Sequence, residues 1–221
     1  MTPKEINSLS QQIRYCYASN RKSKNPVYIS VANLSGATLN HMKDVCGFPD
    51  QWLSRAFSYS TTKSVIEMHA NDDVNKDGNA KDKDVNYSKD GKSKLVYLTS
   101  DSTNVLEHLD DSKVYIIGGI VDRNRLKRAA ISKAETLGVA TAKLPLDDYF
   151  KLVTTKVLTC NHVFDILLKY RELGNDWKKA MLEVLPVRKD VRVIDDDKTK
   201  EMKKISPPQS NKVEQGLDIV K

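Results

Sequence analysis

Apolar residues recur along the chain with two different spacings, and each spacing predicts a different kind of element. Residues 4–22 place Ile6, Leu9, Ile13 and Tyr17 on one side of a helix that Asn25-Pro26 ends. Further helical patterns lie at 36–46, from Asp101 or Ser102 to about 109, from 123 to Gly138, at 163–174 and at 177–184. Strand patterns lie at 27–31, 52–59, 95–99, 114–118, 140–144 and 157–159. This alternation predicts an α/β fold with a parallel sheet that helices cover on both faces.

The stretch 114–127, VYIIGGIVDRNRLK, is the most informative in the chain. Its continuous apolar start predicts a strand buried on both faces of a parallel sheet. Gly118 and Gly119 lack Cβ atoms, so that a ligand or another backbone can approach closely. Asp122 follows the carboxyl end of the strand, where open α/β sheets usually bind their ligands.

Two segments lack the apolar residues that a folded core needs. Residues 71–94 are dense in Lys, Asp, Asn and Gly, which predicts a disordered insertion on the surface. Residues 190–221 are polar and show no periodicity, which predicts a disordered tail. We therefore expect one folded domain over residues 1–189.

Charge and cysteine content limit the partners and the compartment. The formal net charge is +7, which favours an anionic partner, either nucleic acid or a membrane surface. The three cysteines are far apart and form no CxxC, so we expect reduced thiols rather than a disulfide framework or a zinc knuckle. The start of the chain resembles neither a signal peptide nor a transit peptide, and no segment is long enough to span a membrane. These features predict a soluble intracellular protein.

Several common active sites are absent from the sequence. There is no GxGxxG after a strand, no P-loop, no HExxH and no GxSxG, and the four histidines are scattered. No metal site is therefore expected. Asp122 remains, and two interpretations fit it: a general base held ionised by nearby cations, or the N-cap of the helix that follows. The cations after it, Arg123 to Arg128, indicate a phosphate-binding surface or a solvated face.

Six collinear segments resemble the tRNA (guanine-9-N1)-methyltransferase family of the SPOUT superfamily. They are QIRYCYASNR (12–21), LVYLTSDS (95–102), VYIIGGIVD (114–122), AKLPL (142–146), VLTCNHVFDILLKY (157–170) and DWKKAMLEVLPVRK (176–189). The resemblance implies a carboxyl-terminal trefoil knot, a rare exception to unknotted chains. It also implies S-adenosyl-L-methionine as methyl donor, tRNA as substrate, a monomer, and a location in nucleus and cytoplasm.

The same resemblance assigns roles to individual residues. It implies Asp122 as the general base, because the N1 of guanine must lose its proton before or during attack on the methyl group. The implied cofactor residues are Leu98, Thr99, Gly118, Gly119, Arg123, Asn124, Lys127, Leu144, Pro145, Val157, Leu158 and Thr159. The candidate RNA contacts are Arg14, Arg21, Lys22, Arg123, Arg125, Arg128, Arg188 and Lys189.

The segment after Asp122 departs from part of the family. Some members read DHNHHKG where this chain reads DRNRLKR, so histidines that would assist proton transfer are absent. Two alternatives to guanine methylation therefore stay open: an RNA-binding protein without catalysis on the same fold, and methylation of N1 of adenine 9. An adenine N1 already offers a lone pair, so that Asp122 favours guanine without excluding adenine.

Overall fold

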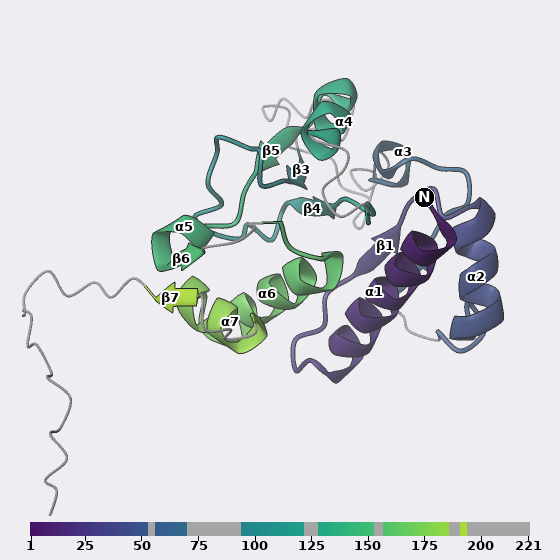
Figure 1. Cartoon of the computed structure of the whole chain (residues 1–221), viewed down its shortest axis with the longest axis horizontal. Coiled ribbons are helices and arrows are strands. Elements are labelled where there is room, and N and C mark those ends of the chain that lie inside the picture. Colours follow the sequence, from purple (N-terminus) through teal and green to yellow (C-terminus); the bar gives the residue numbers. More distant parts are fainter. Residues whose placement is uncertain (53–55, 70–93, 122–127, 153–156, 186–190, 194–221) are drawn as a thin grey trace, which may run out of the picture.

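The computed structural model describes residues 1–52, 56–69, 94–121, 128–152, 157–185 and 191–193. Three parallel strands form its central sheet in the order β4-β3-β5 (Figure 1). They are β3 (Leu95–Leu98), β4 (Val114–Ile117) and β5 (Ala140–Ala142). β3 is the buried strand because it pairs with a neighbour on each side, with Leu95 opposite Val114 and Val96 opposite Ala140. The predicted parallel α/β sheet is confirmed.

β4 differs from its prediction in one respect. We expected the strand at 114–118 to be fully buried, yet all four of its residues are only half-buried. Within the described part of the chain β4 pairs with β3 alone, so its other edge faces a cavity instead of a neighbouring strand. An apolar run predicts that a strand is buried, but it does not show whether that strand lies at the centre or at the edge of the sheet.

Two further strand pairs complete the β-structure of the described residues. β1 (Ile29–Val31) and β2 (Phe57–Tyr59) are parallel, whereas β6 (Phe150–Leu152) and β7 (Val191–Val193) are antiparallel. The β6–β7 pair was not predicted, and it brings together two segments that lie about 40 residues apart in the chain.

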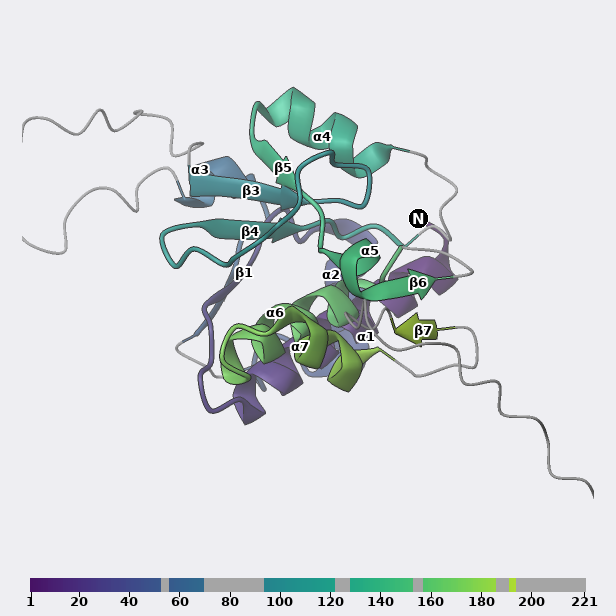
Figure 2. The same cartoon turned by 90° about the vertical axis from the view of Figure 1, so that its left-hand side faces the viewer.

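Helices lie on both sides of the central sheet (Figures 1 and 2). α4 (Ala129–Leu137) contacts β3 and β5, and α6 (Cys160–Glu172) contacts β4 from the other side. The remaining helices are α1 (Pro3–Lys22), α2 (Gly36–Cys46), α3 (Val65–His69), α5 (Leu146–Tyr149) and α7 (Trp177–Val184). α1 packs against both α2 and α6, and α6 packs against α7. The sequence predicted every one of these except the two short helices, α3 and α5.

Helix ends follow the local sequence. Thr2 and Glu5 form a capping box at the start of α1. Asp176 caps α7 as predicted, because its carboxylate accepts a hydrogen bond of 3.0 Å from the Lys179 backbone N–H. Gly47 and Gly138 end α2 and α4 in the left-handed conformation that glycine adopts without strain.

Two predicted elements are absent. The helix expected from residue 101 or 102 to 109 is a turn, because backbone groups there pair with the chain after β5 instead of with each other. The Leu106 N–H donates to the Lys143 carbonyl at 2.8 Å, and the Lys143 N–H donates to the Asn104 carbonyl at 2.8 Å. The strand expected at 157–159 is an extended lead into α6, with Thr159 as its N-cap.

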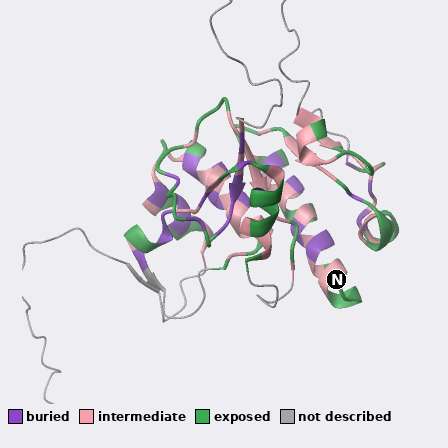
Figure 3. Cartoon of the chain, turned by 90° about the horizontal axis from the view of Figure 1, so that it is seen from above, coloured by how far each residue is buried: buried purple, intermediate pink, exposed green. Residues whose placement is uncertain are grey.

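Three apolar clusters hold the elements together, and Figure 3 shows the buried positions along the inner sides of the helices and strands. The largest joins the sheet to α6 and α7, where Tyr170 and Trp177 stack with ring centroids 3.9 Å apart. A second, aromatic cluster fixes α1 to α2 and β2 through Tyr17, stacked on Trp52 at 4.4 Å. The third lies between α4 and β3. No helix of the described residues is long and apolar enough to cross a membrane.

Candidate active site

A cavity of about 270 Å³ opens at the carboxyl ends of the central strands. Five segments line it: the chain after β3, the chain after β4, the start of α4, the chain after β5 and the chain that enters α6. Open α/β sheets bind ligands at this edge, because loops from several strands converge there. The geometry therefore defines a candidate ligand site.

The wall formed by β3 is held by hydrogen bonds to β5. The Thr99 N–H donates to the Ala142 carbonyl at 2.9 Å. Ser102 Oγ and Thr141 Oγ1 lie 3.0 Å apart, and Ser102 Oγ also accepts from the Asn104 N–H at 3.1 Å. Thr99 and Ser102 are both buried. These hydrogen bonds thus hold the loop after β3 in place, and Leu98, Thr99, Ser100 and Asp101 line the cavity from it.

The wall formed by β4 and α6 is held by Cys160. Its Sγ–H donates to the Gly118 carbonyl at 3.1 Å, and its backbone N–H donates to Gln12 Oε1 at 2.9 Å. Burial raises the pKa of the Cys160 thiol, so the thiol keeps the proton that it donates at neutral pH. Gln12 is buried in α1 and reaches across to the first turn of α6. Together these bonds connect α1, α6 and β4 behind the cavity.

Gln12 and Cys160 were not among the residues that the sequence singled out. One signal for Gln12 was present: it lies on the same helical face as Leu9, Ile13 and Cys16, where a polar residue is out of place. A buried amide on an apolar face needs a partner. The partner itself, 148 positions away, has no local signal in the sequence.

The two glycines after β4 face different surroundings. A Cβ at Gly118 would lie 2.9 Å from the hydroxyl oxygen of Tyr97, and Gly118 lines the 270 Å³ cavity. A Cβ at Gly119 would meet only the Cδ atoms of Leu9, at 3.8 Å. The close approach that the Gly-Gly pair predicted is therefore required at Gly118 and not at Gly119.

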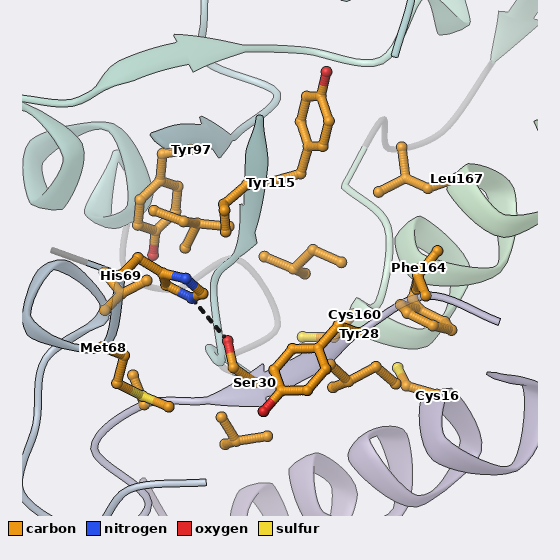
Figure 4. A pocket seen from close by; sticks show the side chains of 18 of the residues that line it. Cys16, Tyr28, Ser30, Met68, His69, Tyr97, Tyr115, Cys160, Phe164 and Leu167 are labelled. Carbon is orange, nitrogen blue, oxygen red and sulfur yellow. Dashed lines mark hydrogen bonds between the residues drawn. The ribbon is translucent and has the colours of Figure 1, made fainter. Parts of the chain in front are cut away.

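A second, larger cavity of about 1570 Å³ also has Gly118 in its lining, and Figure 4 shows side chains around it, Ser30, His69 and Cys160 among them. This larger cavity separates the edge of β4 from β1, α1 and α3. In it Ser30 Oγ and His69 Nε2 lie 3.0 Å apart and connect β1 to the end of α3. Gly118 and Cys160 line both cavities, so they form part of the wall between them.

The structure brings together six of the implied cofactor residues. They line the 270 Å³ cavity and are Leu98, Thr99, Gly118, Leu144, Val157 and Leu158. Three others adjoin it without lining it. Gly119 lines the larger cavity, Pro145 precedes the first turn of α5, and Thr159 donates from its hydroxyl to Asn161 Oδ1 at 2.8 Å. Asp122, Arg123, Asn124 and Lys127 lie outside the described residues.

The implied RNA contacts fall into separate places. Arg14, Arg21 and Lys22 are exposed on α1, where the Arg21 guanidinium lies 5.7 Å from the centre of the Tyr17 ring. Arg128 lines the 270 Å³ cavity, and its side chain is 64% exposed at the cavity mouth. The α1 cations line neither cavity. Arg125, Arg188 and Lys189 lie outside the described residues.

The cavity suits a ligand with both apolar and polar parts. Leu98, Leu144 and Leu158 offer apolar contact, while Asp101 and Asp147 offer carboxylates. Among the residues that the structure describes, no three His, Cys, Asp or Glu side chains are grouped to hold a metal ion. The fold and site thus define an α/β protein with an organic-ligand site at the carboxyl edge of a parallel sheet.

Comparisons with known proteins identify the family. The model of the tRNA (guanine(9)-N(1))-methyltransferase TRM10/TRM10A family matches residues 1–190. The chain belongs to this family, which confirms the resemblance seen in the sequence.

Curated relatives are longer than this chain. The tRNA (guanine(9)-N1)-methyltransferase of Schizosaccharomyces pombe is 37% identical over 222 residues, which cover 99% of this chain and 64% of that protein. The tRNA methyltransferase 10 homolog A of Rattus norvegicus is 36% identical over 190 residues, 86% of this chain and 49% of that protein. The chain thus spans about half to two thirds of the length of these relatives.

Solved structures share the fold. The crystal structure of full-length spTrm10 in complex with SAH superposes with a TM-score of 0.68 at 37% identity, covering 84% of this chain and 88% of that one. A dual-specific Trm10 from Thermococcus kodakaraensis reaches a TM-score of 0.53 at 16% identity, covering 84% and 92% respectively. At that identity the likeness shows the fold alone.

Proposed function

We propose that the protein transfers a methyl group from S-adenosyl-L-methionine to N1 of guanine at position 9 of tRNA. One observation carries this proposal: the convergent loops of the 270 Å³ cavity belong to a chain of the same family as spTrm10, which was crystallised with SAH. SAH is what S-adenosyl-L-methionine becomes when it gives up its methyl group.

The residues of the cavity fit this cofactor. Leu98, Leu144 and Leu158 line the cavity and would contact the adenine, and the Asp101 and Asp147 carboxylates would suit hydroxyl or ammonium groups. When bound, S-adenosyl-L-methionine supplies an electrophilic methyl group on sulfur. The chain contributes the walls, which exclude water and fix the orientation of both reactants. The Cys160 bonds to Gly118 and Gln12 keep two of these walls together.

Asp122 is our candidate for the general base. Ile120 lines the cavity, Val121 is the last described residue of that segment, and Asp122 follows it in the chain. A carboxylate here would take the proton from guanine N1 as the methyl group is transferred. The arginines that follow in the sequence favour its ionised form. No histidine stands near it in sequence to share this role.

The finer architecture is also part of the proposal. We infer that the segments after β4, after β5 and before α6 form the trefoil knot of the SPOUT superfamily, because all three converge on one cavity. The domain limits 1–189, the insertion at 71–94 and the tail rest on composition. Because β7 (Val191–Val193) pairs with β6, the folded part extends at least to residue 193, and the tail is proposed only beyond it. A monomer located in nucleus and cytoplasm remains a prediction from the family resemblance.

Methyl transfer to position 9 tests the proposal directly. The purified protein is incubated with labelled S-adenosyl-L-methionine and three tRNA transcripts that carry G, A or C at position 9. We expect label on the G9 transcript, identified as N1-methylguanosine by nuclease digestion and mass spectrometry. Label on the A9 transcript as well would extend the specificity to adenine. Tight tRNA binding without transfer would favour the RNA-binding alternative.

The base role has its own test. Asp122→Asn keeps the shape of the side chain but cannot accept the proton, so we expect kcat to fall by roughly 100-fold. Binding of SAH, measured by calorimetry, should change little. The log of kcat against pH should also lose the rising limb that the base produces. An unchanged kcat in Asp122→Asn excludes this residue as the base.

A further inference from the structure

Two exposed apolar side chains stand at the mouth of the 270 Å³ cavity. Ile120, after β4, is 38% exposed, and Val157, before α6, is 46% exposed. Both line the cavity, although they lie 37 positions apart in the chain. Large apolar side chains exposed together at the opening of a site are candidates for contact with a ligand.

The two side chains belong to segments that are fixed to each other. Ile120 follows Gly118 by two residues, and Val157 precedes Cys160 by three. The Cys160 Sγ–H···O bond of 3.1 Å to the Gly118 carbonyl joins the two segments directly. Both side chains are β-branched, so they have few rotamers and lose little freedom when a ligand packs against them.

The residues around Ile120 and Val157 indicate which kind of ligand packs against them. Arg128 and Lys143 line the same cavity and suit the phosphates on either side of a nucleotide. Two side chains form too small an apolar area for a stable protein interface, which buries about 800 Å² on each partner. A flat base between flanking phosphates matches both the apolar area and the positive charge.

We propose that Ile120 and Val157 form the apolar walls against which the target purine packs once it has left the base stack. N1 lies on the Watson–Crick edge, so a nucleotide in a stacked, paired tRNA core must be extruded before it can be methylated. Apolar contact on the ring replaces the stacking that extrusion loses. This inference rests on the proposed function and adds the residues that hold the substrate base.

The experiment follows the base itself, using full-length protein and tRNA with 2-aminopurine at position 9. 2-Aminopurine fluorescence rises when the base leaves its stack, so the readout does not require methyl transfer. The test variant is Ile120→Ala/Val157→Ala. The matched control is Leu182→Ala, a 40% exposed apolar residue on α7 that lines neither cavity.

For the wild type and Leu182→Ala we expect the same fluorescence increase on tRNA binding. For the double variant we expect most of that increase to be lost, with kcat/KM for G9 tRNA reduced roughly tenfold or more. The single variant Ile120→Ala should keep SAH affinity within about threefold of the wild type, because Ile120, unlike Val157, is not among the implied cofactor residues. Val157→Thr keeps the volume but adds a hydroxyl, and should show a smaller loss in the same direction.

The outcomes separate the inference from the proposed function. A double variant that keeps the full fluorescence increase and the wild-type kcat/KM overturns the inference, whether or not its affinity for SAH changes. A wild type that binds no SAH and transfers no methyl group overturns the proposed function, whereas the fluorescence still tests the packing of the base. If the double variant does not fold, Val157→Thr decides: unchanged fluorescence and rate count against the inference.

Discussion

At the scale of single residues, Gly118 and Gly119 differ in what surrounds them. The family resemblance implies both as cofactor residues, but only Gly118 lines the smaller cavity. The Tyr97 hydroxyl lies where a Cβ at Gly118 would need room, and Tyr97 is itself buried. A buried ring between packed neighbours does not move aside without cost.

Alanine at these two positions should therefore have unequal effects. We expect Gly118→Ala to lower the free energy of unfolding by about 1–3 kcal/mol and to weaken SAH binding, because the wall of the cavity must shift. Gly119→Ala should stay close to the wild type, since its Cβ would be 3.8 Å from Leu9. Denaturant unfolding and calorimetric titration with SAH measure both. If both variants weaken SAH binding equally, both glycines act as cofactor residues, as the family resemblance implies. The lining of the cavity would then not be enough to tell them apart.

Gln12 acts at the same scale through its bond to Cys160. Gln12→Ala leaves the N–H of Cys160 at the start of α6 without its partner, which costs about 1–3 kcal/mol in a buried setting. We expect a lower free energy of unfolding together with weaker SAH binding, because the α6 wall loses its tie to α1. The matched control is Gln11→Ala, the adjacent glutamine, which lies off this contact. If Gln11→Ala weakens SAH binding as much as Gln12→Ala, the bond has no special role.

At the scale of elements, patterns within short stretches were enough to predict most helices and the three central strands. The predictions that were wrong concern pairing. The segment from 101 to 109 has an acceptable helix start, yet its backbone pairs with Lys143, a residue that lies far along the chain. The run at 157–159 has β-branched residues, yet no strand is beside it within the described residues. The sequence of a short stretch does not show which distant residues its backbone will pair with.

The residues of the candidate site also differ in whether a short stretch of sequence was enough to find them. Gly118 stands at the end of β4, where the sequence alone places ligand residues, whereas Leu98 and Thr99 at the end of β3 were assigned by the family resemblance. The roles of Leu144, Val157 and Leu158 needed the family resemblance, because their own stretches are ordinary apolar sequence. Gln12 and Cys160 needed the structure, because their contact joins α1 to α6 across most of the chain.

Glu172 and Lys169 together link α6 to α1 and α7. Glu172 Oε1 accepts a hydrogen bond of 2.5 Å from Ser23, the C-cap of α1, and Glu172 Oε2 lies 2.9 Å from Lys169 Nζ. Lys169 also lies 3.3 Å from Glu183 on α7. The Ser23 bond, followed by Lys169, lowers the pKa of Glu172. A lowered carboxyl pKa means that the ionised form stabilises the folded state.

This arrangement predicts a pH-dependent contribution to stability. Glu172→Gln resembles the protonated acid, so at neutral pH it should lower the free energy of unfolding by about 1 kcal/mol. The contribution is present above the ordinary glutamate pKa of about 4.3 and is lost as pH falls through the lowered value. The difference between wild type and variant should therefore shrink below about pH 4. Denaturant unfolding at several pH values measures this.

The control for Glu172 is Glu183→Gln. Glu183 meets the same lysine, but its side chain is 49% exposed, so its ion pair contributes little. We expect a smaller effect than for Glu172→Gln at neutral pH. A Glu172→Gln difference that stays constant from neutral to acid pH would mean that charge has no part in joining α1 to α6.

At the scale of the whole molecule, the implied RNA contacts that the structure describes lie in two places, on α1 and at the cavity mouth. Arg14, Arg21 and Lys22 are exposed on α1, and Arg128 stands at the cavity mouth. The net charge of +7 supports binding to a polyanion from either region. A tRNA is large enough to contact α1 while one of its nucleotides occupies the cavity. Under the proposed function, α1 then contributes affinity and the cavity contributes the reaction.

The α1 cations should accordingly control how tRNA binding responds to salt. Each phosphate contact adds about 0.7–0.9 to the slope of log K against log salt. We expect Arg14→Gln/Arg21→Gln/Lys22→Gln to weaken tRNA binding and to reduce this slope by about 2, whereas SAH affinity stays unchanged. The control, Lys43→Gln/Lys63→Gln/Lys179→Gln, removes the same charge from other exposed positions. If both triple variants lower the slope equally, net charge and not the α1 surface attracts the RNA.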